Sequence, residues 1–226
     1  MFSIVVPLYN EEGNIENLIY EIISSLEDFK EYEIVLVDDC SDDNTPELLK
    51  KFETHPNIKI VTNIKNRGQS YSIHKGVTQS FYNTIITIDG DGQNVPSNIP
   101  SLIKEFNDNN DVYLVGGIRN NRKDNFIKIM TSKLANSIRS FILKDNCSDT
   151  GCSLKIFDKK IFLTFPFFNG IHRFLPALFL GYGYKTKFIN VDHRKRNFGY
   201  SKYGTFNRLF VGIRDIIKVR KILKNK

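Results

Sequence analysis

The sequence contains no tryptophan, only three cysteines and only two methionines among its 226 residues. Cys40, Cys147 and Cys152 form neither a disulfide framework nor the spacing of a zinc site, so we expect a reducing, cytoplasmic environment. The first residues form a strand pattern and lack the basic and apolar regions of a secretory signal. The most apolar stretches, 162–168 and 174–183, are interrupted by proline or glycine and fall well below the roughly 18 residues of a bilayer span.

The composition that remains is that of a globular protein with an excess of basic residues. Hydrophobic residues make up 41% of the chain, and the length suits one α/β domain with an appended segment better than two domains. The formal net charge is +7, and most of the excess lies after residue 119, whereas acidic residues cluster in the first half. We therefore expect a first half that holds a metal and a second half that faces anions.

Patterns of apolar residues predict an α/β fold. Runs rich in β-branched residues predict buried strands at 3–8, 33–37, 58–62, 84–88 and 112–115. Helical spacing lies between them, at 15–26, 45–52, 70–81 and 97–106. After residue 119 we expect a basic amphipathic helix at 125–143, a strand at 152–157, an aromatic loop at 162–168, a helix from about 172, a strand at 185–192 and a helix from about 205. The alternation predicts a mostly parallel sheet flanked by helices.

Polar residues follow three of the predicted strands where each strand ends. These are residues 7–12 (Pro-Leu-Tyr-Asn-Glu-Glu), residues 38–43 (Asp-Asp-Cys-Ser-Asp-Asp) and residues 89–93 (Asp-Gly-Asp-Gly-Gln). Ligands of open parallel sheets bind beyond the carboxyl ends of the strands, so we expect these segments to converge on one edge. The loop after the first strand contains only Gly13 in place of Gly-x-Gly-x-x-Gly, which excludes a nicotinamide site.

The acidic segments have a functional and a structural interpretation each. Asp89 and Asp91 can point toward one hard cation, magnesium or manganese, whereas an isolated Asp-Gly-Asp-Gly also suits an acidic β-turn. The other two acidic strand ends favour the metal. Asp39 can accept hydrogen bonds from a ribose or a base, while residues 41–43 are candidates for the N-cap of the next helix. Tyr9 is either a buried side chain or a platform for a nucleobase.

In this order, four motifs resemble those of family 2 glycosyltransferases with the GT-A fold. They are residues 5–12, residues 37–45 (Val-Asp-Asp-x-Ser-x-Asp-x-Thr), residues 66–69 (Asn-Arg-Gly-Gln) and residues 89–93. Three later motifs are similar to the polyprenyl-phosphate branch of that family: residues 149–152 (Asp-Thr-Gly-Cys), 172–176 (His-Arg-Phe-Leu-Pro) and 196–203 (Arg-x-x-Gly-x-Ser-Lys-Tyr). The resemblance covers nearly the whole chain. It implies one Rossmann-like GT-A domain over 1–226, with a nucleotide-sugar half at 1–119 and an acceptor- and membrane-facing half at 120–226.

The resemblance also implies a role for individual residues. Binding of the nucleotide-sugar is assigned to Pro7, Tyr9, Glu11, Asp39, Asp89, Arg119, Arg196 and Lys202, and the metal, Mg²⁺ or Mn²⁺, to Asp91 and Gln93. The catalytic set is Asp89, Asp91, Arg196 and Lys202, and the candidate acceptor site is Asp149, His172 and Arg173. Arg196 and Lys202 match a basic pair that closes over the phosphates, although residues 194–196 also suit a solvated charge run. Asp149 is either a general base or a structural carboxylate at the start of a strand.

The implied reaction is the inverting transfer of a mannose- or glucose-type sugar from a nucleotide-sugar to a polyprenyl phosphate, dolichyl or undecaprenyl. A lipid monophosphate is largely a dianion at neutral pH and needs no general base, whereas a hydroxyl of a lipid or a cell-surface glycan needs one. A non-catalytic module that binds nucleotide or membrane is a further alternative. Without tryptophan, the Gln-x-x-Arg-Trp signature of processive polysaccharide synthases cannot occur.

A lipid acceptor implies contact with a membrane surface, and we expect no nucleic acid partner. The 125–143 segment carries Lys128, Lys133 and Arg139 beside its apolar residues, so it either lies in the interface or packs against the core. The last helix, 206–223, is a second candidate for the interface, and a separate membrane-anchoring protein is an alternative. We expect a peripheral position on the cytoplasmic face of a membrane.

Overall fold

The computed structural model describes residues 1–120, 139–195 and 205–226, and in the last range it describes side chains from residue 212. A seven-stranded sheet has the order β3-β2-β1-β4-β6-β5-β7. The strands are β1 (Phe2–Leu8), β2 (Tyr32–Asp38), β3 (Ile58–Thr62), β4 (Thr84–Thr87), β5 (Val112–Arg119), β6 (Lys155–Asp158) and β7 (Lys185–Val191). Only β6 runs antiparallel to its neighbours β4 and β5, so the mostly parallel sheet is confirmed.

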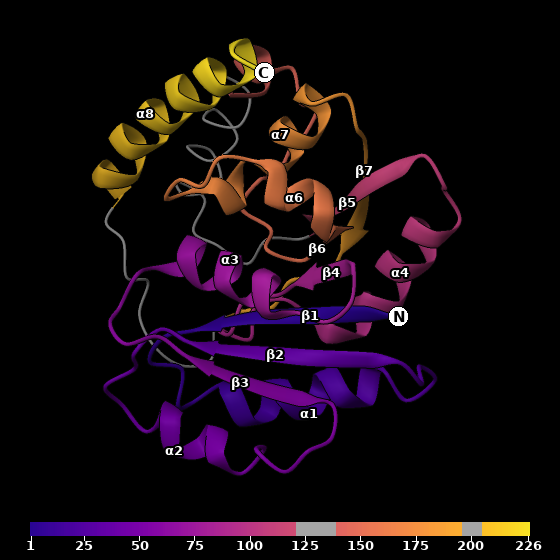
Figure 1. The fold of residues 1–226 in the computed structure, drawn as a ribbon, viewed down its shortest axis with the longest axis vertical. Coiled ribbons are helices and arrows are strands. Elements are labelled where there is room, and N and C mark those ends of the chain that lie inside the picture. Colours follow the sequence, from indigo (N-terminus) through magenta and orange to yellow (C-terminus); the bar gives the residue numbers. More distant parts are fainter. Residues whose placement is uncertain (121–138, 196–204) are drawn as a thin grey trace.

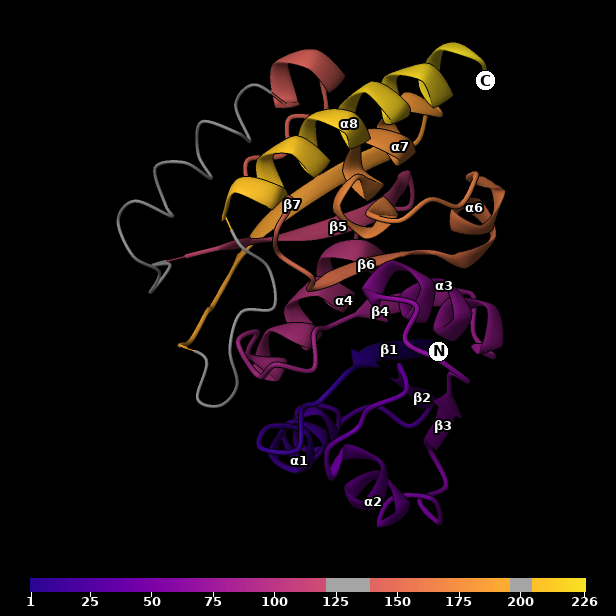
Figure 2. The same cartoon turned by 90° about the vertical axis from the view of Figure 1, so that its left-hand side faces the viewer.

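Helices cover both faces of the sheet (Figure 1). They are α1 (Ile15–Ser25), α2 (Thr45–Lys50), α3 (Gln69–Gln79), α4 (Ile99–Asn107), α6 (Lys159–Thr164), α7 (Leu175–Gly181) and α8 (Thr205–Lys224), with short 3₁₀ turns η1 (Pro96–Asn98) and η2 (Ile171–Arg173). One face packs against α1, α2 and α4, and the other against α3, α6, α7 and α8. Figure 2 shows α8 lying across α7 on the second of these faces.

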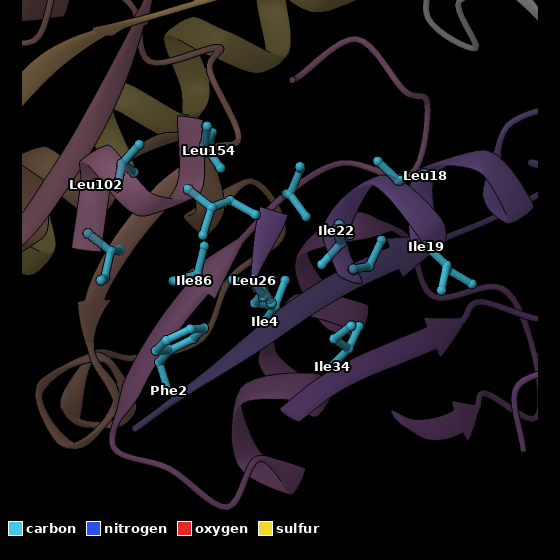
Figure 3. Close-up of a cluster of buried hydrophobic side chains, with 14 of the residues drawn as sticks. Phe2, Ile4, Leu18, Ile19, Ile22, Leu26, Ile34, Ile86, Leu102 and Leu154 are labelled. Carbon is cyan, nitrogen blue, oxygen red and sulfur yellow. The ribbon is translucent and has the colours of Figure 1, made fainter. Parts of the chain in front are cut away.

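The alternation of side chains along each central strand explains the near-continuous apolar runs. Ile4 on β1 and Ile34 on β2 face α1, whereas Val5 on β1 and Val37 on β2 face α3. Figure 3 shows the first of these clusters, in which the side chains of α1 and α4 meet those of β1, β2 and β4. Because both faces of these strands are buried, an alternating polar pattern would leave polar groups in the core.

Helix α3 lies unusually close to the sheet, and Gly76 makes this approach possible. A Cβ atom at Gly76 would lie 2.5 Å from Cγ1 of Val5 and 2.9 Å from Cγ2 of Val37. Any larger residue would push the helix away from β1 and β2. This close packing fixes the first turn of α3, which lies at the strand ends where ligands of such sheets bind.

Several predicted elements differ in extent from those observed. The residues predicted as an aromatic loop at 162–168 begin within α6, where the side chain of Asp158 accepts a hydrogen bond from the backbone N–H of Ile161 and caps the helix. The strand predicted at 152–157 is shorter, and the helix expected from about 172 is η2 followed by α7. Of the helix predicted at 125–143, only 139–143 lies within the described residues, and it is helical there.

None of the helices in the described part of the chain combines the length and the apolar character that crossing a bilayer requires. Helix α8 has 20 residues, but charged residues, among them Arg214, Asp215 and Lys218, interrupt its apolar ones. Its buried side chains include Val219 and Asp215, and its exposed ones include Ile213 and Ile217.

Candidate functional site

The carboxyl ends of β2, β1 and β4 lie next to one another, as the sequence predicted. Leu8 at the end of β1 pairs with Asp38 of β2, and Val5 of β1 pairs with Thr87 of β4. The three polar segments that follow these strands therefore share one edge of the sheet. Pro7 is buried within β1, opposite Val37, and Tyr9 is partly exposed just beyond the strand.

The loops after β1 and β2 are held together by hydrogen bonds. The backbone N–H of Asn10 donates to Oγ of Ser41 (3.0 Å), and the backbone N–H of Glu11 donates to Oγ1 of Thr45 (2.8 Å). Glu11 is buried, and its carboxylate accepts a hydrogen bond from Nδ2 of Asn14 at 2.9 Å. These contacts fix the first strand end, so Glu11 has a structural role in addition to the nucleoside contact implied by its motif.

Asp39 positions the loop that precedes α3. Its Oδ1 accepts hydrogen bonds from Nδ2 of Asn63 (2.6 Å) and the backbone N–H of Arg67 (2.9 Å), and its Oδ2 accepts one from the backbone N–H of Gly68 (2.7 Å). The N-cap position of α2 is Asn44, one residue after the predicted candidates 41–43, and the side chain of Asp43 accepts a hydrogen bond from the first backbone N–H of the helix, that of Thr45 (2.9 Å). Asp39 therefore ties the ends of β2 and β3 to Gly68, the N-cap residue of α3.

The turn 89–93 approaches β1 very closely. A Cβ atom at Gly90 would lie 2.4 Å from Cδ2 of Leu8 and 3.1 Å from the carbonyl oxygen of Pro7. Oδ1 of Asp91 accepts a hydrogen bond from the backbone N–H of Gln93 (3.1 Å), which closes the turn. The glycine therefore brings both aspartates beside the end of β1.

Two residues outside the predicted set of site residues hold Asp89 in place. Nε2 of Gln69 donates to Oδ1 of Asp89 (2.6 Å), and the backbone N–H of Asp89 donates to Oγ of Ser153 (3.0 Å). Gln69 belongs to the Asn-Arg-Gly-Gln motif, which was available as a signal. Ser153 had no such signal in the sequence, because it lies in the segment 152–157 that was predicted as a buried strand.

The carboxyl of Asp89 titrates far from its ordinary range. Burial, together with repulsion by the carboxylate of Asp91, raises the pKa of Asp89 to about 7. Lys155 and Arg119 act in the opposite direction. Two carboxylates that disfavour each other's charge in a partly buried turn form a set of oxygen donors that suits a hard divalent cation.

The metal-ligand set is small. Within the described residues, no three side chains of histidine, cysteine, aspartate or glutamate gather closely enough to hold an ion. Mg²⁺ is commonly held by one or two carboxylates together with the phosphates of a substrate. The residues at the 89–93 turn fit such a substrate-completed site.

Arg119 and Asp149, predicted separately for phosphate binding and for the acceptor site, form an ion pair. Nε of Arg119 lies 2.7 Å from Oδ2 of Asp149, and Nη2 of Arg119 lies 2.7 Å from Oδ1. The side chains are only 13% and 7% exposed. Both carboxylate oxygens of Asp149 accept hydrogen bonds from the planar guanidinium of Arg119. The pair therefore links the end of β5, at Arg119, to the 145–152 segment, which contains Asp149.

His172 and Arg173, in η2, turn toward different partners. Nδ1 of His172 lies 2.7 Å from Oγ of Ser70, the second residue of α3. Burial lowers the pKa of His172 to about 3, with smaller contributions from Arg173 and Lys155, so its imidazole is neutral. Nη2 of Arg173 donates to Asp215 of α8 (2.8 Å). His172 therefore contacts Ser70, the residue that follows Gln69, and Gln69 in turn contacts Asp89. Arg173 instead links η2 to α8 through Asp215.

The basic segment after β7 is only partly described. Arg194 forms two hydrogen bonds to Glu21 of α1 (2.9 and 2.7 Å) and donates to the carbonyl oxygen of Gly92. Arg194 is thus not part of a solvated charge run, whereas Lys195 is exposed. Arg196 and Lys202 lie outside the described residues.

Comparison with known sequences gives a family match and close relatives. The sequence model described as glycosyl transferase family 2 matches residues 3–165. The undecaprenyl-phosphate 4-deoxy-4-formamido-L-arabinose transferase of Edwardsiella ictaluri (strain 93-146) is 33% identical over 205 residues, which cover 89% of this chain and 62% of that protein. The protein of the same name from Shewanella sediminis (strain HAW-EB3) is 33% identical over 208 residues, covering 91% and 62%. The chain spans about 62% of the length of these relatives.

Solved structures with the same fold have much lower sequence identity. Glucosyl-3-phosphoglycerate synthase from Mycobacterium tuberculosis, in complex with Mn²⁺, UDP and glucosyl-3-phosphoglycerate, gives a TM-score of 0.72 at 16% identity, over 97% of this chain and 78% of that chain. The same enzyme with Mn²⁺, UDP-glucose and phosphoglyceric acid gives a TM-score of 0.73 at 15% identity, over 99% and 80%. At such identities the likeness shows a shared fold and nothing about the substrate.

Proposed function

The chain belongs to glycosyl transferase family 2, and from this membership we propose that it transfers a sugar from a nucleotide-sugar to a polyprenyl phosphate, with inversion at the anomeric carbon. One observation supports this proposal most directly. The ends of β1, β2 and β4 bring Asp39 and the 89–93 turn to the same edge of the sheet. The two curated relatives are named as transferases that act on undecaprenyl phosphate, which supports the lipid phosphate as acceptor.

We assign the donor to the half of the protein before residue 120. In this proposal Pro7, Tyr9, Glu11 and Asp39 hold the nucleoside, and Asp89 faces the sugar and the ribose. The Gln69 contact keeps the Asp89 carboxylate beside the turn. Arg196 and Lys202 would close over the phosphates. The half from residue 120 onward faces acceptor and membrane, and the two halves form one catalytic domain.

Asp91 and Gln93 would hold a Mg²⁺ or Mn²⁺ ion. The ion would offset the negative charge that develops on the departing nucleoside diphosphate. The solved relatives bind Mn²⁺ together with UDP or UDP-glucose, which supports a divalent cation here.

A phosphate acceptor agrees better with the geometry of Asp149 than a hydroxyl acceptor does. A hydroxyl needs a carboxylate that can accept its proton, and Asp149 was the candidate for that role. Both oxygens of Asp149 instead accept hydrogen bonds from Arg119. A lipid phosphate with a second pKa of about 6 is already a nucleophile at neutral pH and needs no such base.

The position of the protein at a membrane is a further part of the proposal. We place it at the cytoplasmic face, in contact with the lipid surface directly or through an anchoring protein. On α8, the exposed side chains of Ile213 (50%) and Ile217 (53%) lie next to the exposed basic residues Arg214 and Lys218. An apolar strip flanked by cations suits the interface of an anionic bilayer.

A matrix of nucleotide-sugars against short polyprenyl phosphates, with Mg²⁺ or Mn²⁺, tests donor, acceptor and metal together. We expect a product that releases its sugar in mild acid, because a glycosyl phosphate is acid-labile and an ordinary glycoside largely survives. Transfer to hydroxyl acceptors only, with an acid-stable product, would support the alternative acceptor class. Binding of nucleotide-sugar without turnover on any acceptor would favour a non-catalytic module.

The metal assignment is tested by Asp91→Ala. We expect metal-dependent turnover to be lost while the far-UV circular dichroism spectrum stays unchanged, because Asp91 is partly exposed on a turn. Asp108→Asn is the matched control, since Asp108 is an exposed carboxylate that pairs with Lys104 away from the site. Full activity in Asp91→Ala would refute the assignment.

A further inference from the structure

Lys155 is a buried cation at the edge of the sheet that carries the site. It is the first residue of β6, it pairs with Thr87 of β4 and Gly116 of β5, and only 3% of it is exposed. Because β6 runs antiparallel, its start lies beside the end of β4, two residues before Asp89. Its side chain shares a face of the sheet with that of Phe157, on the side covered by α3, α6 and α7.

Two arginines whose side chains are largely buried have carboxylate partners, and Lys155 differs from them. Arg119 pairs with Asp149, and Arg139 pairs with Asp145. The ammonium of Lys155 donates to the carbonyl oxygen of Cys152, and within the described residues no carboxylate forms an ion pair with it. A carbonyl accepts a hydrogen bond but brings no formal negative charge, so the charge of Lys155 is not neutralised by a direct contact.

The surroundings of Lys155 place its ammonium within electrostatic reach of the site. Lys155 pairs with Thr87, two residues before Asp89, and its charge contributes to the lowered pKa of His172. Burying an ammonium without a paired anion costs free energy, because the charge loses its hydration. Proteins therefore keep buried charges mainly where an anion pairs with them.

The direction of the reaction indicates which anion would neutralise the charge of the Lys155 ammonium. Inversion requires the acceptor to approach the anomeric carbon from the side opposite the nucleoside diphosphate. With the nucleotide at the ends of β2, β1 and β4, the next strands beyond β4 are β6 and β5. Lys155 is therefore on the acceptor side of the sugar, and the stem of lysine lets the ammonium exchange a carbonyl for a phosphate oxygen.

We propose that Lys155 binds the phosphate of the acceptor and holds it for attack; this rests on the proposed function. A phosphate oxygen forms the new bond to the anomeric carbon while the bond from that carbon to the donor's diphosphate oxygen breaks. The electron pair leaves with the nucleoside diphosphate, and Lys155 keeps its proton throughout. Its part is to reduce the repulsion between two anionic phosphates and to orient one of them.

The test compares Lys155→Met and Lys155→Arg with wild-type protein and with Lys160→Met, an exposed neighbour. Methionine keeps the volume of the stem and removes the charge, so the fold is expected to persist, and thermal melting checks this. We expect Lys155→Met to raise the KM for a short polyprenyl phosphate about tenfold or more, the effect of losing one charge-assisted hydrogen bond, with the donor KM unchanged. Lys155→Arg should restore part of the acceptor affinity, and Lys160→Met should behave as wild type.

Binding measurements separate the outcomes. Farnesyl phosphate, farnesol and inorganic phosphate are titrated by calorimetry with UDP and Mn²⁺ present. Binding of farnesyl phosphate that exceeds that of both other probes and is weakened in Lys155→Met supports the assignment. Equal binding of inorganic phosphate would reject the lipid as the source of the phosphate and overturn it.

Two further results would overturn the assignment while leaving the proposed function intact. The first is wild-type acceptor KM in Lys155→Met together with weaker binding of UDP and Mn²⁺, which would make Lys155 a counter-charge for Asp89. The second is a Lys155→Met variant in which neither the acceptor KM nor the binding of UDP and Mn²⁺ changes. Failure of wild-type protein to use any polyprenyl phosphate would instead reject the proposed function itself, whatever the variants do.

Discussion

Protonation of His172 tests how the turn before α7 is packed against α3. The imidazole contacts Ser70 through Nδ1, and burial lowers the pKa of His172 from 6.5 to about 3. Asparagine at this position keeps a polar atom near the place of Nδ1 and cannot be protonated. The informative perturbation is therefore His172→Asn, studied as a function of pH.

The sign and size of the effect follow from the two pKa values. Between about 3 and 6.5 the unfolded chain binds a proton at His172 that the folded protein does not bind, so stability falls as pH falls. Each pH unit in that range is worth ~1.4 kcal/mol, and at about pH 7 the effect is close to zero. From about pH 7 to about pH 5, His172 should therefore remove about 2 kcal/mol from the free energy of unfolding.

Urea denaturation followed by circular dichroism, at both pH values, measures this contribution. Other groups also titrate in this interval; the raised pKa of Asp89, for example, makes the folded state bind more protons and acts in the opposite direction. The relevant quantity is thus the difference between wild type and His172→Asn, with His55→Asn as a matched histidine control. An equal loss of stability in wild type and His172→Asn would show that His172 is hydrated in solution, and the reasoning would fail.

Two substitutions test contacts that the fold depends on. Asp149→Asn leaves the largely buried guanidinium of Arg119 without its carboxylate, and we expect a loss of about 3 kcal/mol in the free energy of unfolding, measured by urea denaturation; a loss below about 1 kcal/mol would show that the pair is hydrated. Asp158→Ala removes the N-cap of α6 and should cost about 1 kcal/mol in the same assay, and an unchanged midpoint would show that packing of Phe162 alone holds the helix.

The sheet was predictable because burial on both faces leaves a strong pattern in the sequence. The strands from β1 to β4 lie within about one residue of their predicted bounds, and β3 matches them in full. Helix α6 was missed because six residues are too few for helical spacing to appear in an apolar, aromatic stretch. Its signal was Asp158 at the end of a strand, which is a local cap and not a periodic pattern.

The edge that carries the site was predictable for a different reason. Strands that are parallel and adjacent bring the residues after them together, so polar strand ends reveal a site without any knowledge of side-chain geometry. The partners of those residues were not accessible in this way. Asp39 with Gly68, and Arg119 with Asp149, are pairs about 30 residues apart whose contact depends on how loops pack.

The same limit applies to the basic character of the second half. The excess of positive charge after residue 119 suggested a surface for anions, but Arg139, Arg173 and Arg194 each form a salt bridge with a carboxylate. Counting charges therefore overstates the capacity of this half to bind phosphate. A cation is available to a substrate only where the fold leaves its charge without a carboxylate, and a buried lysine bonded to a carbonyl satisfies that condition where a paired arginine does not. For this reason Lys155, which the resemblance did not mark, is a stronger candidate for the acceptor phosphate than Arg119, which it did.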